Sequence, residues 1–181
     1  SPIVLDGISL PGLIQYVLDE HDSPSLMVVC GTKAAFLEQL EAASARSFLK
    51  CPTLRILSTS KDVNLIFCPD ITHLRALLAR QTLIPHQPDS IKEGRRILVI
   101  LNLLQLHRPT SAFSVQGVNR TFSVAVEAAH HTNSRLVLAD VWDEEVSILN
   151  VTTKSFRSSE RGWVGRTVKL RTIAERWCIF K

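Results

Sequence analysis

Residues 95–142 decide the fold, and their sequence is RRILVILNLLQLHRPTSAFSVQGVNRTFSVAVEAAHHTNSRLVLADVW. Apolar runs predict strands over residues 97–101 and 135–139. Between them, a polar loop leads into a helical pattern over residues 115–131. Strands that helices cover on both faces are continuous apolar runs rather than alternating ones. The stretch therefore predicts one βαβ unit of an α/β protein.

The same order of strand and helix occurs twice before this unit. Residues 26–30 (LMVVC) predict a buried strand, and a helix is expected over residues 34–46. Residues 63–68 (VNLIFC) predict another strand, followed by a helix over residues 71–80 with Asp70 as its N-cap. The chain is therefore expected to alternate strands with helices, which favours a mostly parallel sheet.

The remaining segments are expected to be peripheral, and the 181 residues to form a single domain. Residues 1–24 predict a lead-in element at the core edge, or alternatively a docking arm for a partner. Residues 81–94 contain two prolines and predict an exposed loop. Residues 165–172 alternate in polarity and are expected to pair with residues 174–180 as an antiparallel hairpin. The predicted fold class is α/β: a three-layer, mostly parallel sheet with a C-terminal antiparallel hairpin.

The positive charge is concentrated at the C-terminal end. The whole chain carries +4, but residues 154–181 contain eight basic and two acidic residues, so they sum to +6 and the first 153 residues to −2. Such an end predicts either a surface that binds a polyanion or a solvated strand face. Trp163 and Trp177 would then stack on a base or pack in the core. The expected nucleic-acid-binding residues are Arg161, Arg166, Lys169, Arg171 and Arg176.

A degenerate nucleotide site is predicted after the strand at residues 26–30. Phosphate loops read G-x-x-x-x-G-K-[ST], but here the strand leads into CGTKAA, in which Gly31 and Lys33 remain and the second glycine and hydroxyl are absent. The strand at residues 97–101 leads into Asn102, where a nucleotide hydrolase has a magnesium-binding acid. We therefore expect no nucleotide hydrolysis, no catalytic residues and no cofactor. Lys33 is expected to be solvated or to contact an anion.

Other chemistry has little support in the sequence. The four cysteines form no CxxC pair, and Cys30, Cys68 and Cys178 sit in apolar runs, which indicates buried free thiols of an intracellular protein rather than a metal site. His107 beside Arg108 suggests an acid/base or phosphate role, or alternatively a surface or capping role. No G-x-S-x-G motif supports a hydrolase. No apolar run is long enough to span a membrane, and no secretory leader is expected.

The order of these features resembles the RecA-like recombinase core. The strand–GTK–helix start, the ILVILN strand and the closing GRTVKLRTIAERWCIF stretch carry the resemblance. It implies a non-catalytic, nuclear subunit of a DNA recombination or repair complex, such as the Shu-type complexes, that binds partner subunits and DNA. The RecA-like accessory ring of Elongator is also similar. The VVCGTKAAFLEQL stretch resembles the centromere pseudo-GTPase subunit, although the expected closing hairpin argues against that relative. These two relatives imply the alternative, a pure protein-interaction scaffold.

Overall fold

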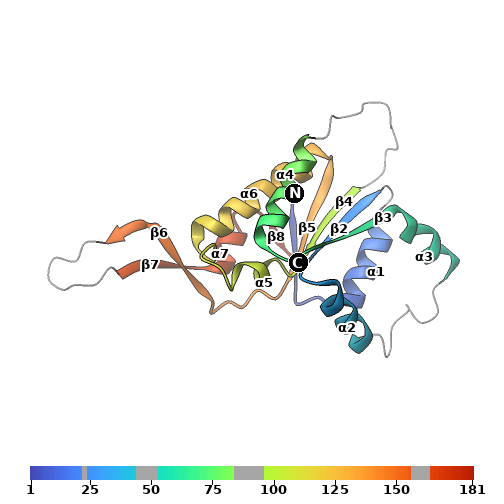
Figure 1. Cartoon of the computed structure of the whole chain (residues 1–181), viewed down its shortest axis with the longest axis horizontal. Coiled ribbons are helices and arrows are strands. Elements are labelled where there is room, and N and C mark those ends of the chain that lie inside the picture. Colours follow the sequence, from blue (N-terminus) through green and yellow to red (C-terminus); the bar gives the residue numbers. More distant parts are fainter. Residues whose placement is uncertain (22–23, 44–52, 84–95, 156–163) are drawn as a thin grey trace.

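The structure is a computed structural model that describes residues 1–21, 24–43, 53–83, 96–155 and 164–181 (Figure 1). Its strands are β1 (Ile3–Asp6), β2 (Ser25–Cys30), β3 (Val63–Cys68), β4 (Arg96–Leu101), β5 (Ser134–Asp140), β6 (Ser147–Ser155), β7 (Val164–Lys169) and β8 (Ile179–Phe180). Its helices are α1 (Leu10–Glu20), α2 (Lys33–Ala43), α3 (Leu54–Thr59), α4 (Ile71–Leu83), α5 (Leu103–His107), α6 (Val115–His131) and α7 (Leu170–Ala174), with a 3-10 turn, η3, at Ser60–Asp62.

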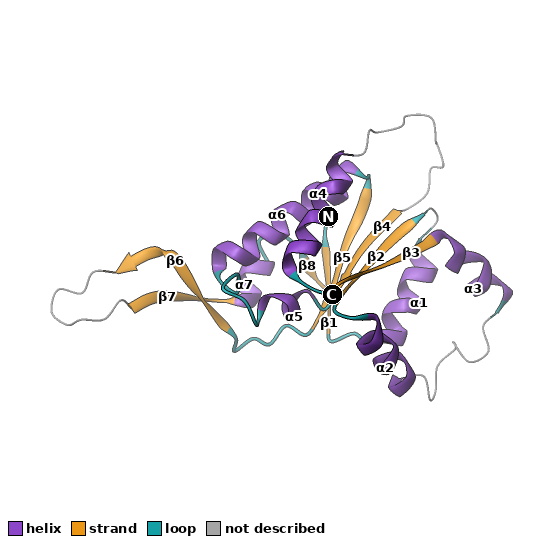
Figure 2. Cartoon of the chain, viewed as in Figure 1, coloured by secondary structure: helices purple, strands orange, loops and turns teal. Residues whose placement is uncertain are grey.

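Six strands form one parallel sheet in the order β3-β2-β4-β5-β1-β8. The chain runs from β1 through β2 to β3 in one direction across the sheet, and from β4 through β5 to β8 in the other. Because parallel crossovers are right-handed, the two directions place helices on opposite faces. Accordingly, α1 and α2 pack on one face, and α4, α6 and α7 pack on the other (Figure 2). The predicted α/β class with three layers is confirmed.

The central strands β2 and β4 are mostly apolar because each contributes side chains to two cores. Val28 and Ile100 face the layer that contains α4 and α6, whereas Val29 and Val99 face the layer that contains α1 and α2. Phe122 of α6 is fully buried at the centre of the first core. The predicted strands at residues 26–30, 63–68, 97–101 and 135–139 are confirmed, as are the three predicted helices that start near residues 34, 71 and 115.

The N-terminal segment is an internal strand rather than the predicted lead-in at the core edge. β1 lies between β5 and β8, and Ile3 pairs with both Val137 and Ile179. Ile3, Val4 and Leu5 are all buried, with Val4 in the core opposite the other two. The prediction was wrong because a run of only three apolar residues gives a weak strand signal, and the sheet supplies the remaining stability.

The C-terminal hairpin exists, but its strands differ from those predicted. β7 pairs antiparallel with β6, not with residues 174–180, and the two strands form a separate sheet that projects from the body (Figure 1). Leu170, Ile173 and Ala174 are buried at helical spacing, so the chain continues as α7. β8 then joins the main sheet parallel to β1.

Two local expectations concern helix boundaries. The Asp70 N-cap is confirmed, because its Oδ1 accepts hydrogen bonds from the backbone N–H groups of Thr72 and His73 at 2.8 and 2.9 Å. The predicted exposed loop at residues 81–94 begins later than expected, since α4 continues to Leu83. The rest of that segment lies outside the described residues.

Candidate functional site

The predicted nucleotide residues lie at the carboxyl edge of the parallel sheet. β2 and β4 are neighbours, and the chain leaves them toward opposite sides of the sheet. Doubly wound α/β proteins bind ligands at such a switch point, outside the carboxyl ends of the strands. Gly31 follows β2, Lys33 begins α2 and Asn102 follows β4. The structure therefore brings all three predicted residues to the edge where a ligand would be expected.

The turn between β2 and α2 uses its own backbone groups. The N–H of Gly31 donates to the carbonyl oxygen of Cys68 at 2.8 Å. The Thr32 hydroxyl accepts from the N–H of Ala35 at 3.2 Å, and the Thr32 carbonyl accepts from the N–H of Phe36 at 3.1 Å. A phosphate loop works by presenting such N–H groups to the phosphates. Here the N–H groups of Gly31, Ala35 and Phe36 are already bonded within the turn and the helix start.

The loop after β4 is closed in a similar way by Asp140. Asn102 has a left-handed backbone with φ 59°, and its N–H donates to the carbonyl oxygen of Ala139 at 2.9 Å. The Asp140 carboxylate accepts from the N–H groups of Leu104 and Val141, both at 2.8 Å. Burial raises the pKa of Asp140, and these two hydrogen bonds oppose that shift. The acid at this edge therefore caps α5, a role that the sequence analysis missed.

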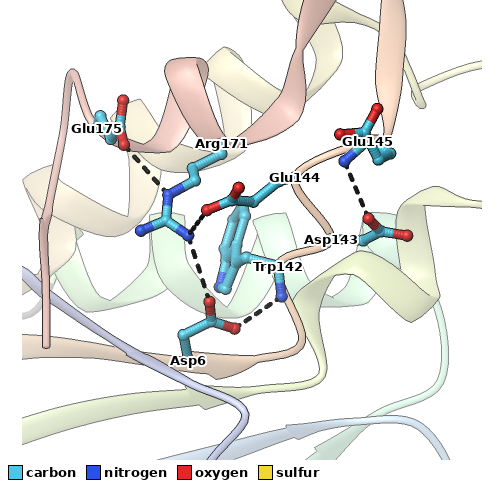
Figure 3. Close-up of polar contacts among 7 residues, drawn as sticks. All are labelled: Asp6, Trp142, Asp143, Glu144, Glu145, Arg171 and Glu175. Carbon is cyan, nitrogen blue, oxygen red and sulfur yellow. Dashed lines mark hydrogen bonds and ion pairs between the residues drawn. The ribbon is translucent and has the colours of Figure 1, made fainter.

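Acidic side chains line the same edge beyond β4. Asp6 ends β1 and is the register partner of Asp140, and its charge contributes to the raised pKa of Asp140. Asp143 and Glu144 follow in the exposed loop after β5 (Figure 3). Like charges repel most strongly where water is partly excluded. A nucleotide triphosphate at this edge would therefore meet these carboxylates as well as Lys33.

Arg171 is engaged by this acidic rim (Figure 3). Its Nη1 lies 2.8 Å from Glu144 Oε1 and 3.7 Å from Asp6 Oδ2, and its Nε lies 3.2 Å from Glu175 Oε1. Its guanidinium carbon also lies 4.5 Å from the centre of the Phe180 ring. Arg171 was expected to lie beside Lys169 on one strand. In the structure β7 ends at Lys169, and Arg171 lies in α7. Contact between Arg171 and nucleic acid stays a prediction. These carboxylates would compete with phosphates for the guanidinium.

The other predicted basic residues do not form one row. Arg166 and Lys169 are exposed on β7, opposite Asn150 and Ser147 of β6. Because they are three residues apart on a strand, they point to opposite faces of the hairpin. Arg176 is exposed after α7. Arg161 and Trp163 lie outside the described residues. Trp177 is half-buried, and its Nε1 donates to Asn119 Oδ1 at 2.8 Å.

His107 is fully buried, so the expected surface position is wrong. Its Nδ1 lies 3.0 Å from the carbonyl oxygen of Ala112, and its Nε2 lies 3.1 Å from Thr121 Oγ1. Because a carbonyl can only accept, we assign the proton to Nδ1 of a neutral imidazole. Arg75 donates to Thr121 Oγ1 at 3.0 Å and to the carbonyl oxygen of Gly117 at 2.8 Å. These groups join α4, α5 and α6 into one network that has a structural role.

Acidification below about pH 6.5 is expected to destabilise the protein through His107. Burial lowers the pKa of His107 and the Arg75 charge lowers it further, while the hydrogen bond to Ala112 opposes these effects. In the unfolded chain the pKa returns to about 6.5. The unfolded state then binds more protons than the folded state below this pH. The free energy of unfolding therefore falls as the pH decreases, by at most about 1.4 kcal/mol per pH unit.

Urea denaturation at pH 7.5 and pH 5.5 measures this effect. The His107→Gln variant removes the titrating group and is expected to lose part of the pH dependence. His130 is an exposed histidine at the end of α6, so His130→Gln serves as the matched control and should behave as the wild type does. A pH dependence that is the same in all three proteins would contradict the assignment.

The described residues offer no evident metal centre or reactive thiol. Within them, no group of three or more histidine, cysteine or acidic side chains is placed to hold a metal ion. Cys30, Cys68 and Cys178 are buried free thiols, as predicted. Burial raises the pKa of all three, so they carry little thiolate at neutral pH. No helix in this part of the chain is long and apolar enough to cross a membrane.

Comparison with known proteins gives one finding. A family model described as SPAC22G7.03-like matches residues 2–180, which is nearly the whole chain. A separate search among curated proteins finds no match.

Proposed function

The chain belongs to the SPAC22G7.03-like family, and we propose that it is a non-catalytic subunit of a multiprotein complex that works by binding partner subunits. The observation that carries this proposal is the state of the carboxyl edge. The N–H groups of Gly31 and Asn102 are bonded within the fold, and the Asp140 carboxylate caps α5. The edge that binds nucleotides in related architectures is thus closed by the chain itself and is acidic.

Exposed apolar side chains support the partner-binding part of the proposal. Leu54 on α3 is 86% exposed, and Val141 after β5 is 66% exposed. α3 contributes no buried residue to either core. On the projecting hairpin, Leu149 is exposed as well. Single exposed apolar residues are ordinary, but a helix without a buried face is stabilised best by a partner.

The misassigned C-terminal hairpin bears on the ranking of the three family resemblances. The expected closing hairpin was the reason for ranking the centromere pseudo-GTPase subunit below the RecA-like subunits. The chain instead ends with α7 and the parallel strand β8. The predicted hairpin therefore does not decide between the pseudo-GTPase and RecA-like resemblances. An interaction scaffold of this kind, or of the Elongator kind, remains the alternative within the same proposal.

The second candidate function is nucleic-acid binding by a nuclear complex of DNA recombination or repair. It is supported by the exposed cations Arg166, Lys169 and Arg176 and by the projecting hairpin. Binding would be made mostly to phosphates and would weaken steeply as the salt concentration rises. Because Arg166 and Lys169 lie on opposite faces of β7, the hairpin would have to enter a groove rather than lie flat on the backbone. This candidate therefore ranks second.

Isothermal titration calorimetry with magnesium ATP and magnesium GTP tests the proposal. We expect no saturable binding of either nucleotide, because the N–H groups of Gly31 and Asn102 are bonded within the fold. Lys33, an exposed cation at this edge, shares it with the carboxylates of Asp6 and Asp140. Binding of either nucleotide at micromolar concentration would contradict the proposal.

A further inference from the structure

A groove of about 450 Å³ lies at the opposite edge of the sheet from the closed carboxyl edge. It is formed by the amino-terminal parts of β2, β3, β4 and β5, by the C-terminal part of α4 and by Thr132, which follows α6. Its volume is within the range of ligand-binding pockets in proteins. None of the residues predicted from the sequence to bind a ligand lies in it. The groove is therefore a second candidate site, independent of the degenerate nucleotide site.

The floor of the groove is aliphatic. Leu98 is buried, and Leu26, Ile66 and Leu77 are half-buried side chains packed against the core that contains α4 and α6. These four side chains form a continuation of the core that the helices do not fully cover. Covering such a surface with an apolar group would release water from it, at roughly 25 cal/mol for each Å² of apolar surface buried.

The groove carries two positive charges. Arg80 is exposed in the last turn of α4, and Arg96 is half-buried at the start of β4. No acidic side chain lines the groove, and neither arginine forms an ion pair within the described residues. The helix dipole of α4 accounts for a cation at Arg80. It does not account for Arg96, a partly desolvated guanidinium for which the described part of the fold supplies no anion.

We propose that this groove binds an acidic segment of a partner subunit, with an apolar side chain on the floor and flanking carboxylates on Arg80 and Arg96. This inference rests on the proposed function and names the chemistry of one partner surface. Arginine binds carboxylates in a bidentate manner, so two such pairs would fix the position and direction of the segment. Among the described residues that line the groove there is no thiol and no histidine.

Aspartate or glutamate side chains fit the groove better than nucleic acid does. Single strands are bound on aromatic side chains where bases stack, and no aromatic residue lines this groove. The aliphatic floor would also be left bare by a phosphate backbone. A protein segment that alternates carboxylates with a leucine or isoleucine satisfies both the floor and the two arginines.

Photo-cross-linking tests this inference on the full-length protein in its own cells. A benzoylphenylalanine side chain at Gln81, on the groove wall, would be activated by light, and the attached peptide would be identified by mass spectrometry. We expect an acidic segment of a co-purifying subunit. A synthetic peptide of that segment should bind roughly 100-fold more weakly to the Arg80→Glu/Arg96→Glu variant. The matched control is Arg55→Glu/Arg120→Glu, two exposed arginines outside the groove, which should bind as the wild type does.

The outcomes separate the inference from the proposed function. Lysine replacements of the acids in the identified segment should restore binding to the Arg80→Glu/Arg96→Glu variant, provided that variant keeps the wild-type urea midpoint. A cross-link to nucleic acid, to a second copy of the chain or to a non-acidic segment would overturn the inference. Loss of partner binding after phosphatase treatment would also overturn the inference, because the bound anion would then be a phosphate and not a carboxylate. If partners co-purify equally with the wild type and the groove variant, only the inference fails. If none co-purifies with the wild type, the proposed function fails.

Discussion

Replacing Gly117 with alanine is expected to lower the free energy of unfolding by about 3 kcal/mol. A Cβ atom at position 117 would lie 2.1 Å from the carbonyl oxygen of Ala112 and 2.8 Å from its carbonyl carbon. Both atoms belong to the backbone, so no side-chain rotation relieves the overlap. Alanine is favoured over glycine in a helix by about 1 kcal/mol, but separating α6 from the preceding loop costs more.

The loss of stability would involve several contacts, because they depend on the close approach of Gly117 to the Ala112 backbone. The N–H of Gly117 donates to the Ser114 hydroxyl at 3.2 Å, which caps α6. The carbonyl oxygen of Ala112 accepts from His107, and that of Gly117 accepts from Arg75. Moving either backbone segment would strain the cap and the buried histidine network together. Urea denaturation of the purified variant measures the change.

Gly12 provides a matched control in α1. It also stands three residues after a capping serine, whose hydroxyl accepts from its N–H at 3.3 Å. A Cβ at Gly12 would meet only side-chain atoms, the nearest being the Ser9 hydroxyl oxygen at 3.1 Å. Gly12→Ala is therefore expected to change stability by less than about 1 kcal/mol. Similar losses for the two variants would show that the Ala112 contact is not the cause.

Reversing the charge of Arg171 is expected to cost on the order of 2 kcal/mol of stability. The Arg171→Glu variant would place a fourth carboxylate among Asp6, Glu144 and Glu175, and would remove the stacking on Phe180. The side chain is about one-third exposed, so solvent screening limits each ion pair to a modest contribution. The effect is large because one guanidinium joins β1, the loop after β5, α7 and β8.

Arg166→Glu on β7 is the control for Arg171. Arg166 is exposed and has no ion pair within the described part of the chain, so its reversal should change the urea midpoint little. Comparison of Arg166→Glu with Arg171→Glu also separates a structural role from a role in nucleic-acid binding. If the basic end binds DNA, Arg166→Glu should weaken binding without loss of stability. An Arg171→Glu protein as stable as the wild type would contradict the role assigned to this arginine.

The parts of the fold that the sequence predicted are those in which the local pattern is long and agrees with the tertiary environment. The runs in β2, β4 and β5 are continuously apolar, β3 is interrupted only by Asn64, and α6 combines the Ser114 cap with a long amphipathic pattern. The N-terminal and C-terminal elements were misassigned for the opposite reason. β1 and β8 have four and two residues, and their stability comes from pairing with each other and with β5.

The candidate sites were only partly accessible from the sequence. Spacing placed Gly31 and Asn102 at one edge, because loops after neighbouring parallel strands must meet there. The capping role of Asp140 depends on a residue far away along the chain, Leu104, and no pattern encodes that contact. The groove joins Arg80 and Arg96 with the starts of four strands. Amino-terminal strand ends carry no recognised motif, so no pattern indicated that these residues meet.

Calorimetric titration of the full-length protein with magnesium ATP and magnesium GTP tests most directly whether the carboxyl edge is closed. The Lys33→Ala variant is the matched comparison, because Lys33 is exposed at the start of α2 and is the predicted phosphate lysine. The predicted result is the absence of saturable heat for either nucleotide, with identical traces for the two proteins. Stoichiometric binding at micromolar concentration by the wild type, lost in Lys33→Ala, would contradict it and would establish a working nucleotide site.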